Sequence, residues 1–315
     1  AGTPPPWLLA AITASLTDLA AYPRPAAAVA AVAERHAVAP DRVLLTAGAA
    51  EAFVLIARAF RPRHPVVVHP QFTEPEAALR SAGHLVDRVI LRPENGFVLD
   101  PAAVPRDADL VIIGNPTNPT SVLHRADDLR ELARPDRILV VDEAFMDAVP
   151  GEPESLAGAS IPGLVVIRSL TKTWGLAGLR IGYVLAHASL IEQLAAVQPH
   201  WPVSTPALAA AIACSNERSV AEAAQAAVDI ERQRVQLVDS LGAIPGVSVY
   251  GVPRAPFVLV QVPGAAQVRE SLRTQGFAVR RGDTFPGLGP DWLRIAVRPE
   301  DVTDGFVKVL SDLLR

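Results

Sequence analysis

Residues 169–180 read Ser169-Leu170-Thr171-Lys172-Thr173-Trp174-Gly175-Leu176-Ala177-Gly178-Leu179-Arg180. The lysine in this stretch, Lys172, is unusual. Of the 29 lysine and arginine residues of the chain, only Lys172 and Lys308 are lysines. A guanidinium stays protonated and is a poor nucleophile, whereas an amine can lose its proton and attack a carbonyl. Lys172 is therefore a candidate Schiff-base residue. Lys308 lies in an apolar C-terminal run and carries no such signal.

An apolar run precedes this stretch, and similar runs recur along the first two thirds of the chain. They lie at residues 42–46, 66–68, 110–113, 138–141, 164–167 and 181–184. Helical stretches, such as 26–36 and 49–60, separate them. Runs without polar alternation indicate strands buried on both faces, as in a mostly parallel sheet covered by helices. The pattern predicts an α/β fold with a three-layer α/β/α domain.

The pattern changes after about residue 205. A long helical stretch at 206–241, with a break near Ser215-Asn216, precedes short apolar segments and two further helices. Strands are expected at 247–250, 257–262, 277–280 and 292–297, with a helix at 265–275 and a closing helix. We therefore expect an N-terminal arm at 1–24, a large domain at 25–205 and a smaller α+β domain at 206–315.

Composition limits the classes of partner. The net charge is −4 and no dense basic stripe occurs, which argues against nucleic acid. No uncharged apolar run approaches the roughly 20 residues of a membrane span. The single Cys214 excludes an intramolecular disulfide, and the first residues lack a signal-peptide pattern. These features predict a cytoplasmic protein without nucleic-acid or membrane partners.

Polar clusters follow several of the expected strands. Ligands of open α/β sheets bind beyond the carboxyl ends of the strands. The segment 46–51, with Gly48, Ala49 and Ala50, opens a helix whose N–H groups can bind a phosphate; the alternative is an ordinary tight turn. Asn118 lies in a Pro-rich segment after 110–113. Its amide can donate to a phenolic or carboxylate oxygen, although a simple turn explains the segment as well.

Asp142 directly follows the apolar run 138–141, so we expect it to be partly desolvated and to need a cationic or donor partner. A protonated ring nitrogen is one such partner, and a helix cap or a structural ion pair is the alternative. A metal is discounted, because no histidine lies at suitable spacing from Glu143. Ser169 and Arg180 bracket Lys172 and can bind a phosphate dianion. An amine, a buried carboxylate and phosphate ligands together match the needs of pyridoxal phosphate.

The ordered set of motifs resembles the fold-type-I, class I/II pyridoxal-phosphate aminotransferases over nearly the whole chain. The resemblance is greatest to the histidinol-phosphate aminotransferase branch and to the L-threonine-O-3-phosphate decarboxylases of cobalamin biosynthesis. It implies that Lys172 is the Schiff-base lysine and proton carrier, that Asp142 pairs with the pyridinium nitrogen, and that Asn118 donates to ring O3′. The implied phosphate ligands are Gly48, Ala49, Ala50, Ser169, Thr171 and Arg180.

Further positions take their roles from the same resemblance. Phe72 matches the aromatic side chain that stacks on the pyridine ring, and Tyr22 matches the tyrosine that reaches the cofactor phosphate of a partner subunit. The resemblance thus implies a homodimer with shared active sites. Arg294 matches the arginine that grips the substrate carboxylate or phosphate. Arg280 or Arg281 is expected to be a second anion ligand.

Two departures from the family pattern affect the expected chemistry. The aminotransferases usually carry Asp-Glu-Ala-Tyr where this chain has Asp142-Glu143-Ala144-Phe145, so the ring O3′ loses a hydroxyl partner. The polar N-terminal arm that closes over substrate is short or missing before Pro4. We expect transamination of a small phosphorylated amino compound. Decarboxylation of L-threonine phosphate is the alternative, and a non-catalytic cofactor-binding protein is a remote one.

Overall fold

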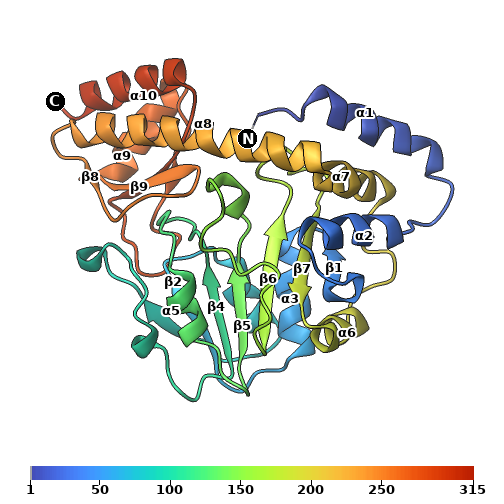
Figure 1. Cartoon of the computed structure of the whole chain (residues 1–315). Coiled ribbons are helices and arrows are strands. Elements are labelled where there is room, and N and C mark those ends of the chain that lie inside the picture. The colour runs from blue at the N-terminus through green and yellow to red at the C-terminus, as the bar shows by residue number, and fades with distance from the viewer. Residues whose placement is uncertain (1) are drawn as a thin grey trace.

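The computed structural model describes residues 2–315 and contains two β-sheets with helices around them (Figure 1). The larger sheet has the strand order β1-β7-β6-β5-β4-β2-β3. Its strands are β1 (Val43–Thr46), β2 (Pro65–His69), β3 (Asp87–Ile90), β4 (Leu110–Gly114), β5 (Ile138–Asp142), β6 (Leu164–Ser169) and β7 (Gly182–Ala186). The pairs from β3 to β6 are parallel, whereas β7 runs antiparallel to both neighbours. The predicted mostly parallel sheet is confirmed.

Successive side chains of each strand point to opposite faces, and both faces are apolar. In β4, Val111 and Ile113 join one core cluster, whereas Leu110 and Ile112 join another. The first cluster includes residues of α1 (Pro6–Ala14), α2 (Ala26–Arg35), α5 (Ala126–Glu131) and α7 (Thr205–Ser215). The second includes residues of α3 (Ala49–Ala59), α4 (Glu74–Ser81) and α6 (Ala188–Ala196). This arrangement is the expected three-layer α/β/α sandwich.

The smaller sheet has the order β10-β11-β9-β8 and is antiparallel throughout. Its strands are β8 (Ser248–Val249), β9 (Phe257–Gln261), β10 (Arg280–Arg281) and β11 (Trp292–Ala296). A third apolar cluster joins this sheet to α9 (Ala265–Thr274), α10 (Glu300–Leu313) and the end of α8 (Glu217–Gly242). The predicted strand at 277–280 is wrong for its first three residues. Phe277 instead packs edge-on against Phe306 of α10, with ring centroids 5.7 Å apart, so the core holds its side chain without a ladder.

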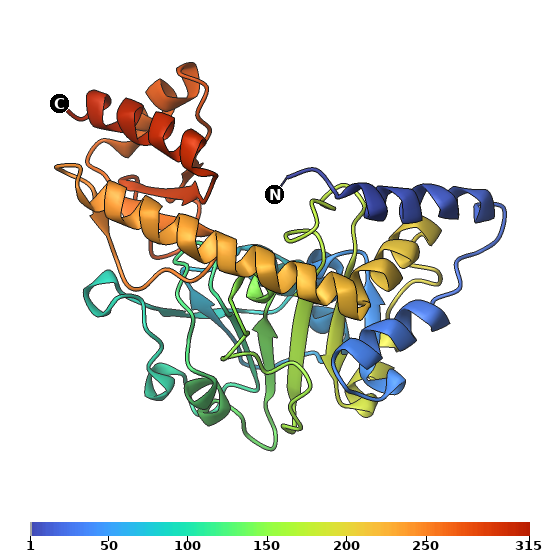
Figure 2. The same cartoon turned by 45° about the horizontal axis from the view of Figure 1, so that its top comes forward.

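The break expected near Ser215-Asn216 separates α7 from α8. The Asn216 side chain accepts a hydrogen bond from the Ser219 N–H at 2.9 Å, which caps the new helix. Figures 1 and 2 show α8 crossing above the large sheet, with α1 and α7 near one end and the small sheet near the other. The domain boundary near residue 205 stays a prediction. Because α7 packs against α1 and α2, a boundary after α7 is favoured.

Short 3₁₀ turns complete the described chain. They lie at Ser15–Asp18, Pro40–Arg42, Pro93–Asn95, Pro101–Ala103 and Met146–Ala148. Across residues 2–315, no helix combines the length and apolar character needed to cross a membrane.

Candidate active site

A cavity opens where β4, β5 and β6 end and α3 begins, at the edge of the sheet where the sequence predicts a site. Gly114 at the end of β4 and Phe145 line it together with side chains from β5, β6 and α3. Its other lining residues are Gly48, Ala49, Ala50, Gln71, Phe72, Pro116, Asn118, Asp142, Ala144, Ser169, Thr171, Lys172 and Arg180. A second cleft continues from it toward the small sheet and shares Phe72, Asn118, Phe145, Thr171 and Lys172 with it.

One end of the cavity is shaped for an anion. Gly48 has a φ of 77°, and a Cβ there would lie 2.6 Å from an Arg180 guanidinium nitrogen, so glycine lets that guanidinium approach the chain. Gly48 provides no side-chain cap to α3, which leaves the first N–H groups of an 11-residue helix directed at this end. The Ser169 and Thr171 hydroxyls lie 2.8 Å apart beside it.

Asp142 ends β5, and no cation among residues 2–315 is in direct contact with its carboxylate. Oδ1 accepts a hydrogen bond from the Ala144 N–H at 3.1 Å. Burial raises the pKa of Asp142 to about 6, and the more distant Lys172 only partly offsets that rise. A cationic N–H placed in the cavity would satisfy this carboxylate.

Lys172 lies in the turn after β6 and lines the cavity. Burial lowers the pKa of its amine, and the positive charge of Arg294 lowers it further. The Nζ atom lies 5.4 Å from the centroid of the Phe145 ring. A larger share of neutral amine at neutral pH makes Lys172 a better nucleophile than an exposed lysine.

Arg294, from β11, lines the second cleft from the side of the small sheet. Its Nη1 donates to Asn118 Oδ1 at 2.5 Å, and its guanidinium stacks over the Phe257 ring at 4.9 Å. Nε is buried and has no partner among the described residues. Burial lowers the pKa of Arg294 to about 10, with a further contribution from Arg280. Because the Asn118 oxygen accepts from Arg294, its amide N–H groups remain to donate.

The structure separates the two arginines that the sequence left as alternatives. Arg280 lines the cleft and stacks over the Phe285 ring at 5.6 Å. The Arg281 guanidinium is paired with the Asp283 carboxylate and is absent from the residues that line the cleft in the described chain. Arg280 is therefore the better candidate for a substrate ligand.

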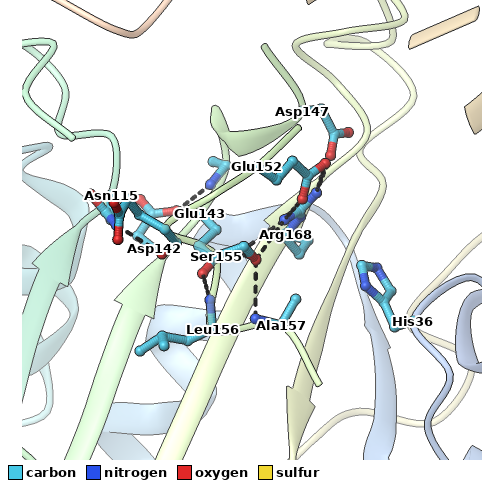
Figure 3. A network of polar contacts seen from close by, with 12 residues as sticks. His36, Asn115, Asp142, Glu143, Asp147, Glu152, Ser155, Leu156, Ala157 and Arg168 are labelled. Atoms are coloured by element: carbon cyan, nitrogen blue, oxygen red, sulfur yellow. Dashed lines mark hydrogen bonds and ion pairs between the residues drawn. The ribbon is translucent and has the colours of Figure 1, made fainter. Parts of the chain in front are cut away.

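A second polar cluster lies on the opposite face of the same strands, among α2, β5 and β6 (Figure 3). Arg168, on β6, donates to Glu143 Oε2 at 2.9 Å and to Glu152 Oε2 at 2.8 Å, and it also pairs with Asp147. Asp147 further accepts from Arg35 at 2.9 Å. Burial opposes ionisation of Asp147, but the two guanidiniums hold its pKa below its usual range.

The strand pleat explains why neighbours in the sequence belong to different clusters. Asp142 and Ser169 point to the α3 face, whereas Glu143 and Arg168 point to the α2 face. The α2-face cluster was not predicted from the sequence. Its signal is a charged residue directly after the apolar run 164–167, within a strand whose two faces are buried.

Most of the residues singled out from the sequence line the cavity or the cleft that continues from it, and two, Tyr22 and Arg281, do not. Tyr22 is 72% exposed and stacks on Trp201 at a centroid distance of 4.2 Å, outside the cavity of its own chain. Gln71 lines the cavity but was missed, although it directly precedes Phe72. Its side chain donates to the Ile112 carbonyl at 3.1 Å, which holds the segment carrying Phe72 against β4.

The donor set of the cavity fits pyridoxal phosphate. The groups around Gly48 suit a phosphate dianion, and Thr46 Oγ1 beside them is a buried hydroxyl without a partner in residues 2–315. Asp142 suits a protonated ring nitrogen, Asn118 suits a phenolic oxygen, and the Lys172 amine suits an aldehyde.

Comparisons with known proteins agree with this geometry. Residues 2–310 match the family model described as aminotransferase class I and II. A Mycobacterium tuberculosis protein named histidinol-phosphate aminotransferase is 51% identical over 300 residues, which cover 94% of this chain and 81% of the relative.

Two solved structures share the fold. L-threonine-O-3-phosphate decarboxylase from Porphyromonas gingivalis has a TM-score of 0.87 and 25% identity, with 98% of this chain and 95% of that chain covered. Histidinol-phosphate aminotransferase from Clostridium acetobutylicum has a TM-score of 0.89 and 24% identity, with 99% and 96% covered. The chain belongs to the class I and II aminotransferase family, and its cofactor is pyridoxal 5′-phosphate.

Proposed function

We propose that this enzyme transfers the amino group of a small phosphorylated amino compound, of which histidinol phosphate is the example that its relatives' names provide. The observation that carries the proposal is the convergence of Lys172 with Arg280 and Arg294 on one cleft. The amine supplies the nucleophile, and the two guanidiniums supply binding energy for an anionic substrate.

Bound pyridoxal phosphate supplies an aldehyde for amines and a ring that withdraws electrons from the bonds of the substrate α-carbon. Lys172 would hold the cofactor covalently and would carry a proton at Nζ, a role that its lowered pKa supports. Asp142 would keep the ring nitrogen protonated, and Asn118 would donate to the phenolic oxygen. Gly48, Ala49, Ala50, Ser169, Thr171 and Arg180 would hold the phosphate, and Phe72 would pack on the ring.

Decarboxylation is the second candidate. Phe145 supports it, because a hydroxyl that aminotransferases usually direct at the cofactor is replaced here by an apolar ring. The likeness to the decarboxylase from Porphyromonas gingivalis supports it as well. The arginines of the cleft would decide between the two reactions, because they would orient the substrate and so determine which bond of its α-carbon is presented for cleavage.

One experiment separates the two candidates. The cofactor-loaded enzyme is supplied with 2-oxoglutarate and either histidinol phosphate or O-phospho-L-threonine, and glutamate and carbon dioxide are both measured. Glutamate formation supports transamination. Carbon dioxide release without glutamate transfers the assignment to the decarboxylase, and absence of both products with either substrate refutes the proposed function.

We also infer that two copies of the chain form a homodimer with shared active sites. Tyr22 and Trp201 form an exposed aromatic pair, and the neighbouring Leu16 and Leu19 are about half exposed. Exposed apolar groups of this kind are typical of a protein interface. Sedimentation at micromolar concentration tests the proposal: a dimer is expected, and a fully active monomer would contradict it.

A further inference from the structure

Ser121, in the segment after β4, has an unusual backbone conformation. Its φ is 66°, in the left-handed region that residues other than glycine and asparagine adopt rarely. A residue stays in this region where the surrounding contacts enforce it, and such residues are concentrated at functional sites. Because Ser121 is fully buried, the contacts that enforce its conformation come from the protein itself.

These contacts join Ser121 to the segment that leads into β9 of the small sheet. The Arg254 N–H donates to the Ser121 carbonyl at 2.7 Å and to its hydroxyl at 3.1 Å. The Ala255 N–H donates to the same hydroxyl at 2.8 Å. Ala255 is fully buried, and within residues 2–315 its N–H meets no other acceptor. The hydroxyl therefore satisfies a buried donor that would be costly to leave unpaired.

The segment before β9 is itself held in place by the small domain. Arg234, buried on α8, donates from Nη1 to the Arg254 carbonyl at 3.1 Å. Phe257, at the start of β9, lines the cleft, and its ring centroid lies 4.9 Å from the Arg294 guanidinium. Ser121 is thus bonded to a segment that continues directly into the wall of the cleft.

The turn that contains Ser121 also carries Asn118. The Ser121 N–H donates to the Thr117 carbonyl at 2.7 Å, and the Thr117 N–H donates to the Val122 carbonyl at 2.8 Å. The Thr117 hydroxyl donates to the carbonyl of Gly114, at the end of β4, at 2.6 Å. Asn118 lies between these bonded residues, so a displacement of Ser121 would move it.

The turn at 117–122 therefore contacts the small domain at two points. Asn118 Oδ1 accepts from Arg294 on β11, and the Ser121 hydroxyl accepts from the segment before β9, the strand that pairs with β11. We propose that Ser121 is a positioning residue. By fastening the turn to the segment before β9, its hydroxyl holds the Asn118 amide against the phenolic oxygen of the cofactor. This role rests on the contact of Asn118 with the cofactor under the proposed function.

The absorbance of the bound cofactor tests this role without turnover. An amide N–H that donates to the phenolic oxygen stabilises the anionic form of that oxygen, so its loss raises the pH at which the bound cofactor gives up its proton. Asn118→Ala should raise this midpoint by roughly one to two pH units, as expected for a hydrogen bond to a charged group. Ser121→Ala should raise it by about half a unit or more, because the amide is then less well placed.

Ser121→Gly separates the effect of the hydroxyl from that of the backbone conformation. Glycine adopts a φ of 66° without strain but lacks the acceptor, so the midpoint should rise as it does in Ser121→Ala. Because the backbone is relaxed, this variant keeps the test decisive even where Ser121→Ala fails to fold. A wild-type midpoint in Ser121→Gly would overturn the proposal.

Ser219→Ala on α8 is the matched control. The Ser219 hydroxyl is also buried and donates to a backbone carbonyl, that of Ala213, at 2.7 Å, and the residue lies outside the lining of the cavity and the cleft in the described chain. Its loss should lower stability in urea titrations and leave the midpoint unchanged. An equal rise in Ser219→Ala would show that the midpoint follows stability, and the proposal would then be wrong.

Asn118→Ala distinguishes the two levels of the proposal. A raised midpoint in Asn118→Ala without a rise in the two Ser121 variants would overturn the role of Ser121 alone. An unchanged midpoint in Asn118→Ala would refute the contact of Asn118 with the cofactor, and the role of Ser121 with it. The choice of reaction is decided separately, by the glutamate and carbon dioxide that the enzyme forms.

Discussion

The carboxyl ends of β5 and β6 carry two polar clusters, one on each face of the sheet, which differ in how far their charges are satisfied. On the α2 face, Glu143 accepts hydrogen bonds from the Leu156 N–H at 2.6 Å, the Ser155 hydroxyl at 2.7 Å and Arg168 at 2.9 Å. On the α3 face, its sequence neighbour Asp142 accepts a hydrogen bond from the Ala144 N–H and meets no guanidinium in the described structure. Two adjacent residues at the end of β5 thus differ: the Glu143 carboxylate accepts several hydrogen bonds, and the Asp142 carboxylate has few partners.

This difference distinguishes a structural polar cluster from a ligand-binding site. The α2-face cluster is a closed set of donors and acceptors that joins three segments of chain. Burial there is compensated within the protein. The α3-face cavity keeps a carboxylate that meets no guanidinium in the described structure and an amine whose pKa burial lowers, and a ligand must supply what the chain does not.

The largest expected effect is on turnover, from a substitution in the α3-face cavity. Lys172→Ala should lower turnover at least about a thousandfold, because both the covalent link and the proton carrier are lost. Borohydride reduction followed by intact-mass measurement should find the cofactor joined to the wild type and absent from the variant. Lys308→Ala is the control and should keep the adduct. An adduct that persists in Lys172→Ala would assign the link to another residue.

A substitution in the α2-face cluster should lower the stability of the protein. Arg168→Met leaves Glu143 and Asp147 without their shared cation and should reduce the free energy of unfolding by about 3–5 kcal/mol in urea titrations. Arg232→Met removes an exposed pair with Asp229 on α8 and should cost less than about 1 kcal/mol. A similar loss in the two variants would remove the distinction between the clusters.

The buried Asp142 carboxylate predicts that the stability of the cofactor-free protein depends on pH. The folded-state pKa of Asp142, about 6, lies above its ordinary value of 3.8. Its contribution to stability is therefore present below pH 3.8 and is lost as the pH rises through 6. Asp142→Asn lacks this loss, so its advantage over the wild type should grow by up to about 3 kcal/mol between pH 4 and pH 8.

Unfolding titrations at several pH values measure this advantage. A gap between Asp142→Asn and wild type that does not change with pH would show that the carboxylate is already satisfied in the cofactor-free protein. Cofactor addition should reverse the order of the two proteins at pH 8, because the ring nitrogen then loses its partner in the variant.

The smallest effect concerns the two adjacent arginines of β10. Arg280→Gln should raise KM about tenfold, as expected for a lost hydrogen bond to an anion, whereas Arg281→Gln should change KM by less than about twofold. Initial rates over a substrate series give both values. The reverse order would place Arg281 at the substrate.

The sequence predicted the fold through its apolar runs, because a strand buried on both faces leaves a continuous apolar signal. It did not predict that β7 runs antiparallel, since chain direction in a sheet depends on the length and path of the connections. The strand expected at 277–280 was shorter, because an apolar side chain such as Phe277 packs equally well from a loop.

For the site, residue types and order were sufficient to bring Lys172, Asp142 and Asn118 to one cavity. The sequence could not separate Arg280 from Arg281, because the pleat decides which of two neighbours faces the cleft. It also missed the cluster around Arg168, because Arg35 and Arg168 are far from its carboxylates along the chain and meet them only after folding.

The helix α8 has a mechanical consequence. Its 26 residues span about 39 Å as one rod, with its first half beside the large sheet and its second half fixed to the small one. Each degree of tilt at the first end moves the far end by about 0.7 Å, a lever estimate from that length. A tilt of about three degrees would thus carry the small sheet, and Arg294 with it, by up to about 2 Å relative to Lys172.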